Sequence, residues 1–460
     1  MNLLSQALQA KSLSVSQNHT VDIAPADRLR HLIKTHQALI GVVGIGYVGL
    51  PLAVEQAKAD FQVLAFDRSA IRVAQANQGL NYIRDVSDED LARVVASGKF
   101  TATTDMSRLG GCDIIVICVP TPLTPNKEPD ISYITNVVHD IASQLRPGQL
   151  IILESTTYPG TTEEIVLPIL QRSELVCGKD FFLGFSPERV DPGNKRFNTH
   201  NTNKVVGAVT AECLDVAATF YEQTITEVLR VSSPRVAEMT KVFENTFRAV
   251  NIALVNEMAL LCDRMGINIW DVIDAAATKP FGIMRFEPGP GVGGHCIPLD
   301  PHYLSWKAKQ YDFYVRFIEL AAQVNQTMPY FVRDRISRAL NEESKSLRGS
   351  QVLVLGMAYK RDVSDWRESP ALKVVELLEG DGVKVKYHDP HIASFADDHG
   401  KVRRSVPLTD DLLTSSDCVA ILTDHSAFDW DRIVSRARLV VDTRNATCNI
   451  QDNREKIVRL

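Results

Sequence analysis

The segment LIGVVGIGYVG, residues 39–49, carries the pattern that decides the fold. A short apolar run predicts a β-strand, a G-x-G-x-x-G sequence follows at once, and helix-forming residues come directly after it. In this arrangement the first glycine permits a tight turn, the second lets the backbone approach a pyrophosphate, and the third lets the helix pack closely on the strand. The segment therefore predicts a dinucleotide-binding βα unit, with contacts from Gly44, Gly46, Tyr47, Val48 and Gly49.

An acidic residue after the next apolar run indicates which dinucleotide is bound. Asp67 ends the run at 62–66 and lies 18 residues beyond Gly49, close to the ~20 expected for a carboxylate that binds the ribose hydroxyls. Such a carboxylate would repel a 2′-phosphate, so we expect NAD as the cofactor. Arg68 and Arg72 leave tolerance of NADP open, because an arginine can accommodate that phosphate. Otherwise Arg68 is solvated, and Arg72 neutralises an adenosine-side phosphate or pairs with Asp67.

Alternation of strands and helices organises most of the chain. Apolar runs at 39–43, 62–66, 113–118 and 149–153 are each followed by a helix-length segment, and the pattern returns at 351–355, 383–387, 418–422 and 439–441. This predicts an α/β fold with two Rossmann-like doubly wound domains, joined by a long central helix and a helical middle domain. The expected divisions are an N-terminal extension without an assigned role (1–37), an NAD-binding domain (38–232), a central domain (233–345) and a second Rossmann-like domain (346–460).

The segment between the two α/β regions has the period of a helix. Neither glycine nor proline interrupts residues 235–265, which predicts one long helix of the kind that lies between domains or subunits. Lys241 and Asn245 are four residues apart and share a face. Their apolar flanks, Phe243 and Phe247 among them, indicate that this face is buried and needs a partner. A second helical stretch is expected over 312–347.

A loop rich in glycine and proline, PGPGVGGHCIPLDP at 288–301, contains the most informative cysteine. Cys296 lies where no helical or strand period requires a core residue, so we expect a reactive thiol with a cation nearby to lower its pKa. The other seven cysteines are predicted to be buried, inert thiols. Asp300 before Pro301 is a good helix N-cap, and its second oxygen could face the thiol. No second Cys/His cluster completes a four-ligand site, so we expect no metal.

Composition excludes several classes of protein. The chain has 460 residues, a net charge of −6 and 45% hydrophobic residues, and its 25 glycines and 21 prolines are too few for a collagen-like or low-complexity chain. An acidic chain without a basic stripe is a poor candidate for binding nucleic acid. No apolar stretch approaches the ~20 residues that span a bilayer, and the scattered cysteines indicate a reducing compartment. We expect a soluble cytoplasmic protein with neither a nucleic acid nor a membrane as partner.

Further motifs in the same order as in one known family support a resemblance. The chain resembles the UDP-glucose/GDP-mannose dehydrogenase family over about residues 38–455. The matching motifs are residues 44–49, 119–122, 154–156, 159–162, 185–189, 241 with 245, 293–296, 359–360, 367–370 and 442–445. The resemblance implies NAD-dependent oxidation of the C6 alcohol of a nucleotide sugar, twice, to a carboxylate that serves surface polysaccharide biosynthesis such as capsule or O-antigen.

Two stretches indicate a branch of that family. PGPG before GGHC, and SPERVDPG at 186–193, are similar to the enzymes that oxidise UDP-N-acetylhexosamines. This implies UDP-N-acetylglucosamine as the substrate, with UDP-N-acetylmannosamine, UDP-N-acetylgalactosamine and UDP-glucose as alternatives. A catalytically silent nucleotide-sugar sensor is the alternative of another class. A two-electron hydroxyacid dehydrogenase shares the N-terminal fold but would need neither the thiol nor a second α/β domain.

The resemblance also implies roles for individual residues. Cys296 is the nucleophile that traps the aldehyde as a thiohemiacetal, which a second oxidation converts to a thioester. Lys241 and Asn245 match the positions that stabilise the oxyanion. Asp300 and Thr156 match the positions that hold the water, and Glu188 matches the base for hydrolysis, although Glu188 could instead pair with Arg189. Thr121 and Arg367 match cofactor contacts; the candidate substrate contacts are Arg189, Arg285, Lys360 and Arg444. The long helix suggests a homodimer or a higher homo-oligomer.

Overall fold

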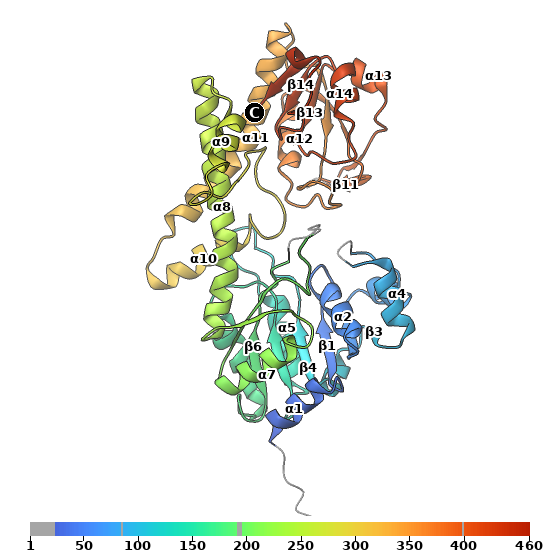
Figure 1. The fold of residues 1–460 in the computed structure, drawn as a ribbon, viewed down its shortest axis with the longest axis vertical. Helices are drawn as coiled ribbons and strands as arrows, with labels where there is room; N and C mark the ends of the chain where they lie inside the picture. Colours follow the sequence, from blue (N-terminus) through green and yellow to red (C-terminus); the bar gives the residue numbers. More distant parts are fainter. Residues whose placement is uncertain (1–23, 84–85, 191–195, 398–399) are drawn as a thin grey trace, which may run out of the picture.

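The computed structural model describes residues 24–83, 86–190, 196–397 and 400–460. An N-terminal α/β domain and a C-terminal α/β domain are connected along one side by the long helix α8 (Figure 1). In these described ranges, no helix combines the length and the apolar character needed to cross a membrane. The predicted fold class is confirmed.

The N-terminal domain contains a sheet with the strand order β3-β2-β1-β4-β5-β6-β7-β8. The first six strands in chain order are parallel, whereas β7 is antiparallel to β6 and β8 runs with β7. The strands are β1 (Leu39–Val43), β2 (Gln62–Phe66), β3 (Phe100–Thr103), β4 (Ile114–Ile117), β5 (Leu150–Leu153), β6 (Phe182–Phe185), β7 (Lys204–Ala208) and β8 (Val228–Arg230).

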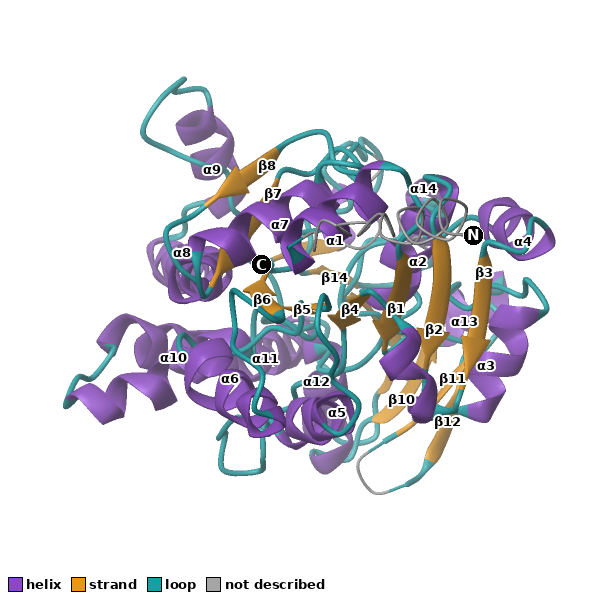
Figure 2. Cartoon of the chain, turned by 90° about the horizontal axis from the view of Figure 1, so that it is seen from below, coloured by secondary structure: helices purple, strands orange, loops and turns teal. Residues whose placement is uncertain are grey.

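Helices cover both faces of this sheet, with α1 and α7 on one side and α5 and α6 on the other (Figure 2). Ile40 and Val42 of β1 belong to the core on one face, and Val43 belongs to the core on the other, as a strand buried on both faces requires. The helices are α1 (Pro25–Lys34), α2 (Gly49–Lys58), α3 (Ala70–Asn77), α4 (Asp88–Ala96), η1 (Met106–Gly111), α5 (Ser132–Ala142), η2 (Thr162–Val166), α6 (Leu167–Leu170), η3 (Gln171–Ser173) and α7 (Ala211–Tyr221).

The N-terminal extension contains a helix that the sequence analysis missed. Residues 1–23 lie outside the described part, but α1 packs on α7 and buries Leu29 and Ile33. Arg30 forms ion pairs with Glu212 and Asp215 of α7 at 2.6 and 3.0 Å. Residues 25–34 therefore belong to the N-terminal core.

The central region is helical, as predicted. Ser233 caps the N-terminus of the helix α8 (Pro234–Met265), where its side chain accepts the N–H of Val236, and Gly266 in the left-handed region (φ 67°) caps the C-terminus. It packs against α10 (Asp300–Ala308) and α11 (Arg316–Glu342). The remaining helices are α9 (Ile269–Ala277) and η4 (Lys309–Tyr311).

The C-terminal domain contains a parallel sheet with the order β10-β9-β13-β14-β15. Its strands are β9 (Gln351–Leu355), β10 (Lys384–His388), β13 (Cys418–Ile421), β14 (Val440–Asp442) and β15 (Ile457–Arg459). The helices α12 (Pro370–Gly380), α13 (Asp410–Ser415), α14 (Trp430–Arg436) and η5 (Arg454–Lys456), and a hairpin of β11 (Ser394–Ala396) with β12 (Val402–Arg404), complete it. The strands expected in this half are thus confirmed.

Candidate active site

The glycine-rich loop after β1 forms a cradle at the start of α2. Gly44 has a φ of +93°, and a Cβ there would meet the carbonyl oxygen of Cys118 at 2.6 Å. A Cβ on Gly49 would collide with the carbonyl of Gly44, whereas one on Gly46 would meet no atom within 4 Å. Close packing therefore requires glycine at positions 44 and 49. Gly46 opens onto space at a helix N-terminus, which fits a pyrophosphate.

Asp67 lies beside this cradle. Its Oδ2 accepts the N–H of Ile45 at 3.2 Å, and its Oδ1 accepts the N–H of Ser69 at 2.8 Å. The guanidinium of Arg72 is 3.7 Å from the carboxylate. Of the roles that the sequence leaves open for Arg72, the structure therefore contains the pairing with Asp67. The side chain of Asp67 is 10% exposed, which leaves its carboxylate accessible to a ribose.

The loop at 288–301 packs closely against the C-terminal domain, which explains its glycines. A Cβ on Gly289 would meet Arg444 Nη1 at 2.5 Å, and a Cβ on Gly293 would meet the carbonyl of Glu368 at 2.6 Å. Gly294, with a φ of +89°, lies against the ring of Tyr359. The residues next to Cys296 are thus held by the domain that carries Lys360 and Arg444.

Asp300 forms the centre of a buried polar cluster next to Cys296. Its N–H donates to the carbonyl of Cys296 at 2.8 Å, and its Oδ2 accepts from Asn245 Nδ2 at 2.5 Å. Arg248 donates to the amide oxygen of Asn245 at 3.0 Å. Asp300, Lys241 and Asn245 are buried, whereas Cys296 is exposed. The prediction of a buried Lys241–Asn245 face is therefore confirmed.

The charge state of this cluster follows from its burial. Burial raises the pKa of the Asp300 carboxyl to about 6, although Lys241, Asn245 and Arg248 favour the ionised form. A carboxyl that titrates near neutral pH can exchange protons during a reaction.

Glu188 lies near Lys241 but contacts other partners. Its Oε1 accepts the N–H groups of Arg189 and Val190 at 2.6 and 2.7 Å, and its Oε2 is 3.4 Å from Nζ of Lys204. The guanidinium of Arg189 pairs instead with Glu244 of α8 at 2.6 Å. The ion pair between the side chains of Glu188 and Arg189, which the sequence leaves open, is therefore not observed.

Three parts of the chain meet at the mouth of the cradle. The guanidinium of Arg367 lies 5.5 Å from the ring centroid of Tyr47 and pairs with Asp365 at 3.0 Å. His295 Nδ1 is 3.5 Å from the same aspartate, and its ring centroid is 6.3 Å from that of Tyr47. The glycine loop (residues 44–49), the loop at 288–301 that carries Cys296 (the cysteine loop) and the C-terminal domain are thus in contact. A site shared by the two α/β domains requires such contact.

The helix α10 fixes the cysteine loop to the N-terminal domain. Tyr303 donates to the carbonyl of Thr121, whose hydroxyl donates to the carbonyl of Thr156 at 2.7 Å. Lys307 pairs with Glu164 at 2.6 Å. The two threonines therefore belong to the support beneath α10.

One predicted substrate contact, Arg285, has different surroundings from those expected, and part of another motif is not described. Arg285 is exposed and pairs with Asp274 at 2.5 Å and with Glu287 at 3.1 Å, so it is directed to α9 within this chain. Asp191, Pro192 and Gly193 of the SPERVDPG stretch lie outside the described residues. Lys360 is half-buried in the loop that follows β9, five residues beyond its end and next to Tyr359 in the sequence.

Some other predictions about burial are wrong. Phe243 and Phe247 are 61% and 43% exposed, because they lie on the face of α8 opposite to Lys241 and Asn245. Of the seven remaining cysteines, Cys448 is exposed and two are half-buried, Cys177 and Cys262.

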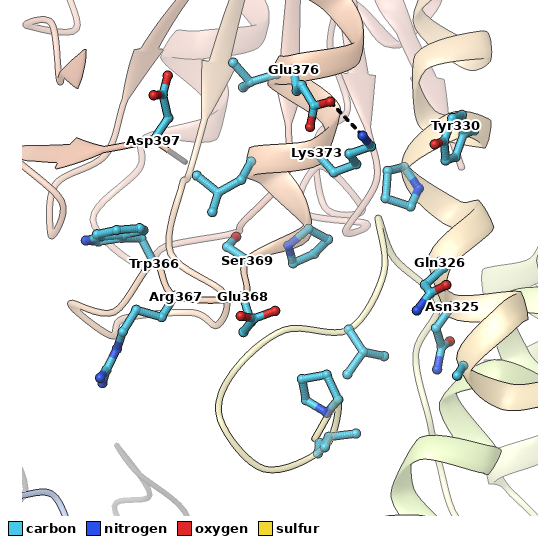
Figure 3. A pocket seen from close by; sticks show the side chains of 18 of the residues that line it. Asn325, Gln326, Tyr330, Trp366, Arg367, Glu368, Ser369, Lys373, Glu376 and Asp397 are labelled. Atoms are coloured by element: carbon cyan, nitrogen blue, oxygen red, sulfur yellow. Dashed lines mark hydrogen bonds and ion pairs between the residues drawn. The ribbon is translucent and has the colours of Figure 1, made fainter. Parts of the chain in front are cut away.

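A cavity of about 860 Å³ lies between α11, α12 and the cysteine loop, which contributes Val292, Ile297 and Pro298 to its lining (Figure 3). Arg367, Glu368 and Ser369 line it from the segment before α12, and an ion pair between Lys373 and Glu376 at 2.7 Å lies along its wall. The cavity thus adjoins the loop that carries Cys296.

In the described part of the chain, one group of side chains has metal-ligand character. Atoms of Asp362, His391 and His425 lie within 4.8 Å of one another. His425 already accepts the N–H of Asp362 through Nδ1 at 2.9 Å, and its Nε2 is 3.1 Å from Asp389. Both ring nitrogens of His425 are engaged, so the group is better explained as a structural network.

A glycine cradle beside an accessible carboxylate, next to an exposed cysteine between two α/β domains, fits an NAD-dependent dehydrogenase. The chain belongs to the UDP-glucose/GDP-mannose dehydrogenase family: residues 38–225 match the family's NAD binding domain, 235–327 its central domain and 353–449 its UDP binding domain. It is thus an NAD-dependent nucleotide-sugar dehydrogenase.

Several relatives share most of the chain. The UDP-N-acetyl-D-mannosamine dehydrogenase of Pyrococcus horikoshii is 34% identical over 88% of this chain and 95% of its own length, and a solved structure of that enzyme gives a TM-score of 0.82 at 31% identity, covering 92% and 98%. The UDP-N-acetyl-D-glucosamine 6-dehydrogenase of Pseudomonas aeruginosa is 36% identical over 77% and 83%. The NDP-N-acetyl-D-galactosaminuronic acid dehydrogenase of Ralstonia nicotianae is 34% identical over 88% and 95%.

Proposed function

We propose that this protein oxidises the C6 alcohol of a UDP-N-acetylhexosamine twice, to the uronic acid, with Cys296 as the nucleophile. The observation that carries the proposal is an exposed thiol at the end of a tightly packed loop, next to the buried cluster around Asp300. Two hydrides leave the carbon and one water oxygen enters. A covalent intermediate suits such a reaction, because it retains the aldehyde while the cofactor is exchanged.

The residues of the cluster have complementary roles in this proposal. The thiolate of Cys296 adds to the aldehyde, and Lys241 and Asn245 stabilise the oxygen that becomes negatively charged. After the second oxidation the thioester is cleaved by a water that Asp300 and Thr156 hold, and Glu188 accepts its proton. Bound NAD supplies the hydride-accepting nicotinamide.

The binding residues follow the two sheets. Asp67, Arg72 and the glycine loop would hold the dinucleotide, with Thr121 and Arg367 near its reactive end. Lys360 and Arg444 at the C-terminal sheet, with Arg189, would contact the UDP-sugar. Arg285, which pairs with Asp274 and Glu287 on the surface, would contact the substrate of the same or of a neighbouring subunit.

The names of the relatives support an N-acetylhexosamine as the substrate and divide over its stereochemistry. UDP-N-acetylglucosamine is our first choice, and UDP-N-acetylmannosamine, UDP-N-acetylgalactosamine and UDP-glucose are the alternatives. Use of the product in surface polysaccharides stays a prediction.

NADH release with a panel of UDP-sugars tests the proposal. We expect two NADH per molecule of UDP-N-acetylglucosamine and little reaction with UDP-glucose. One NADH per sugar would indicate a two-electron dehydrogenase. Binding of the sugar without any NADH release would favour the sensor.

We also propose a homodimer, on the basis of an apolar stripe along the outer face of α8. Its members are 38% to 61% exposed and repeat at helical spacing: Val236, Met239, Phe243, Phe247, Leu254, Leu261 and Met265. A stripe on one helix about 48 Å long can pack on its own copy across a twofold axis. Light scattering should give twice the chain mass, and Phe243→Asp should give monomers; a monomeric wild type would contradict the dimer.

A further inference from the structure

A lysine that the sequence analysis did not single out lies at the carboxyl edge of the N-terminal sheet. The antiparallel pairing of β6 and β7 places Gly184 opposite Ala208 and Phe185 opposite Gly207. Extending that register beyond the end of β6 places Lys204 opposite Glu188. A residue that begins a reversed strand lies where the parallel strands end, so Lys204 also meets Glu154, which directly follows β5.

Lys204 lies between these two carboxylates. Its Nζ is 2.7 Å from Oε1 of Glu154 and 3.4 Å from Oε2 of Glu188, and its side chain is 5% exposed. Tyr221 donates to Oε1 of Glu154 at 2.5 Å. An ammonium taken out of water needs such partners to offset its desolvation. One buried positive charge is thus shared by two carboxylates, one of them at the candidate site.

We propose that Lys204 is a positioning residue for Glu188, which it holds as an oriented carboxylate by sharing its charge between Glu188 and Glu154. This inference rests on the proposed function, in which Glu188 takes the proton of the water that cleaves the thioester. Because Glu154 competes for the same ammonium, removing either partner of the Lys204–Glu154 pair changes the pH range over which Glu188 is ionised.

The surroundings of Glu188 agree with this role. The groups that face it come from several elements: Lys204 of β7, Lys241 of α8, Glu154 after β5, Cys118 after β4, and the N–H groups of Arg189 and Val190. Burial by itself raises the pKa of Glu188, but Lys204, the Val190 N–H and Lys241 together lower it below its usual value. Burial raises the pKa of Glu154 in spite of Lys204.

The pH dependence of thioester cleavage tests the proposal. Acid formation is followed by rapid quench between about pH 3 and pH 8, a range that includes values below the usual glutamate pKa, after the NADH burst, with UDP-N-acetylglucosamine or the UDP-sugar that the wild type oxidises. Lys204→Met should move the acid limb of the rate profile upward by about one pH unit or more, because a nearby cation lowers a carboxyl pKa by that amount. Lys204→Arg should restore the wild-type limb.

Glu154→Gln is the matched variant that separates positioning from simple packing. It leaves the ammonium of Lys204 to Glu188 alone, so the acid limb should move to lower pH, opposite to the change in Lys204→Met. Because Lys204→Met leaves Glu154 buried without its cation, the double variant Lys204→Met/Glu154→Gln is measured as well, and its limb should also lie above that of the wild type.

The outcomes are distinct. Acid limbs that coincide in the wild type, Lys204→Met, the double variant and Glu154→Gln would overturn the role of Lys204. Loss of rate without any shift of the limb would do the same, since that is the result of a structural role. A wild type that releases one NADH per sugar, or a Glu188→Gln variant that cleaves the thioester at the wild-type rate, would reject the proposed function itself.

Discussion

The two Rossmann-like sheets both place an aspartate after their second strand, but the surroundings of the two carboxylates differ. Asp67 follows β2 and accepts the N–H of Ile45 from the loop after β1. Asp389 follows β10 and accepts the N–H groups of Met357 and Ala358 from the loop after β9, at 2.6 and 2.9 Å. Each aspartate thus joins the first loop of its sheet to the second strand.

The difference lies in what else each carboxylate binds. Asp389 also accepts the N–H groups of His391 and Ile392, and His425 Nε2 is 3.1 Å away. Its side chain is 0% exposed, against 10% for Asp67. Burial by itself raises the pKa of Asp389, but His425 and the backbone donors lower it well below its usual value. Asp389 is therefore structural, whereas Asp67 can bind a ribose.

The first loops differ in the same sense. Both loops begin with a tightly packed glycine, since a Cβ on Gly44 or on Gly356 would meet a carbonyl oxygen at 2.6 Å. Two positions further on, Gly46 of the N-terminal loop faces open space, whereas Ala358 of the C-terminal loop is fully buried. An acid after the second strand marks a dinucleotide site only where the carboxylate is accessible and the first loop is open. The comparison assigns NAD to one sheet alone.

The largest expected effect separates chemistry from cofactor binding. Cys296→Ser should lower acid formation by at least about 10⁴-fold, because a serine hydroxyl is a far weaker nucleophile at neutral pH. Since the dinucleotide is held by the N-terminal sheet, the Kd for NAD should stay within about twofold, a difference below about 0.5 kcal/mol. Quenched-flow analysis and fluorescence titration measure the two quantities. Normal turnover by this variant would exclude the covalent mechanism.

A structural aspartate should affect stability and leave the cofactor unaffected. Asp389→Asn removes the charge that its donors surround and should cost about 3–5 kcal/mol in the free energy of unfolding of the C-terminal domain. This contribution is present above the ordinary carboxyl pKa and is lost as the pH falls through the lowered folded-state value. Denaturant unfolding measures the loss. A weakened affinity for NAD at the same time would contradict the comparison.

A third buried aspartate should respond with the opposite sign. Burial raises the pKa of Asp300 to about 6, so its ionised form costs up to about 3 kcal/mol of stability. The cost is absent below ~pH 4, grows as the pH rises to about 6 and is constant above that. Asp300→Asn should therefore stabilise the protein at neutral pH while it lowers activity. Equal stability of variant and wild type across this range would show that the ionised form of Asp300 does not destabilise the fold.

The smallest expected effect concerns the choice of dinucleotide. Asp67→Ala should raise the KM for NAD by about tenfold, the value of one or two hydrogen bonds to a carboxylate. The KM for NADP should rise less, because the repulsion of a 2′-phosphate is removed and Arg72 remains. Asp389→Asn serves as the control with an unchanged ratio. The same NAD/NADP preference in the wild type and Asp67→Ala would show that Asp67 does not contact the ribose.

Local patterns were sufficient to predict much of the fold. The glycine loop, Asp67 and the strands at 39–43 and 351–355 follow from short-range spacing and from apolar runs. The Lys241–Asn245 face was recognised because helical spacing and apolar flanks point to burial. Helix α1 was missed, although Leu29 and Ile33 lie four residues apart, because its polar neighbours obscure the period.

Long-range pairing was beyond these patterns. Lys204 is one charged residue before an apolar run, and only the reversed direction of β7 brings it to Glu188 and Glu154. The sequence places Phe243 and Phe247 on the buried face wrongly, because apolar character alone does not distinguish a core from an outward stripe. The position of Arg444 against Gly289 depends in the same way on the packing of two domains.

Covalent capture by Cys296 is the central claim, and peptide mass analysis tests it most directly. Glu188→Gln, in which hydrolysis should be slow, is mixed with NAD and a UDP-sugar that the wild type oxidises, and is then quenched in acid and digested. We expect the peptide that contains Cys296 to carry the acyl nucleotide sugar as a thioester, and Cys296→Ser to carry none. Acid product formed by Glu188→Gln without an adduct on Cys296, or formed by Cys296→Ser at the wild-type rate, would contradict the account.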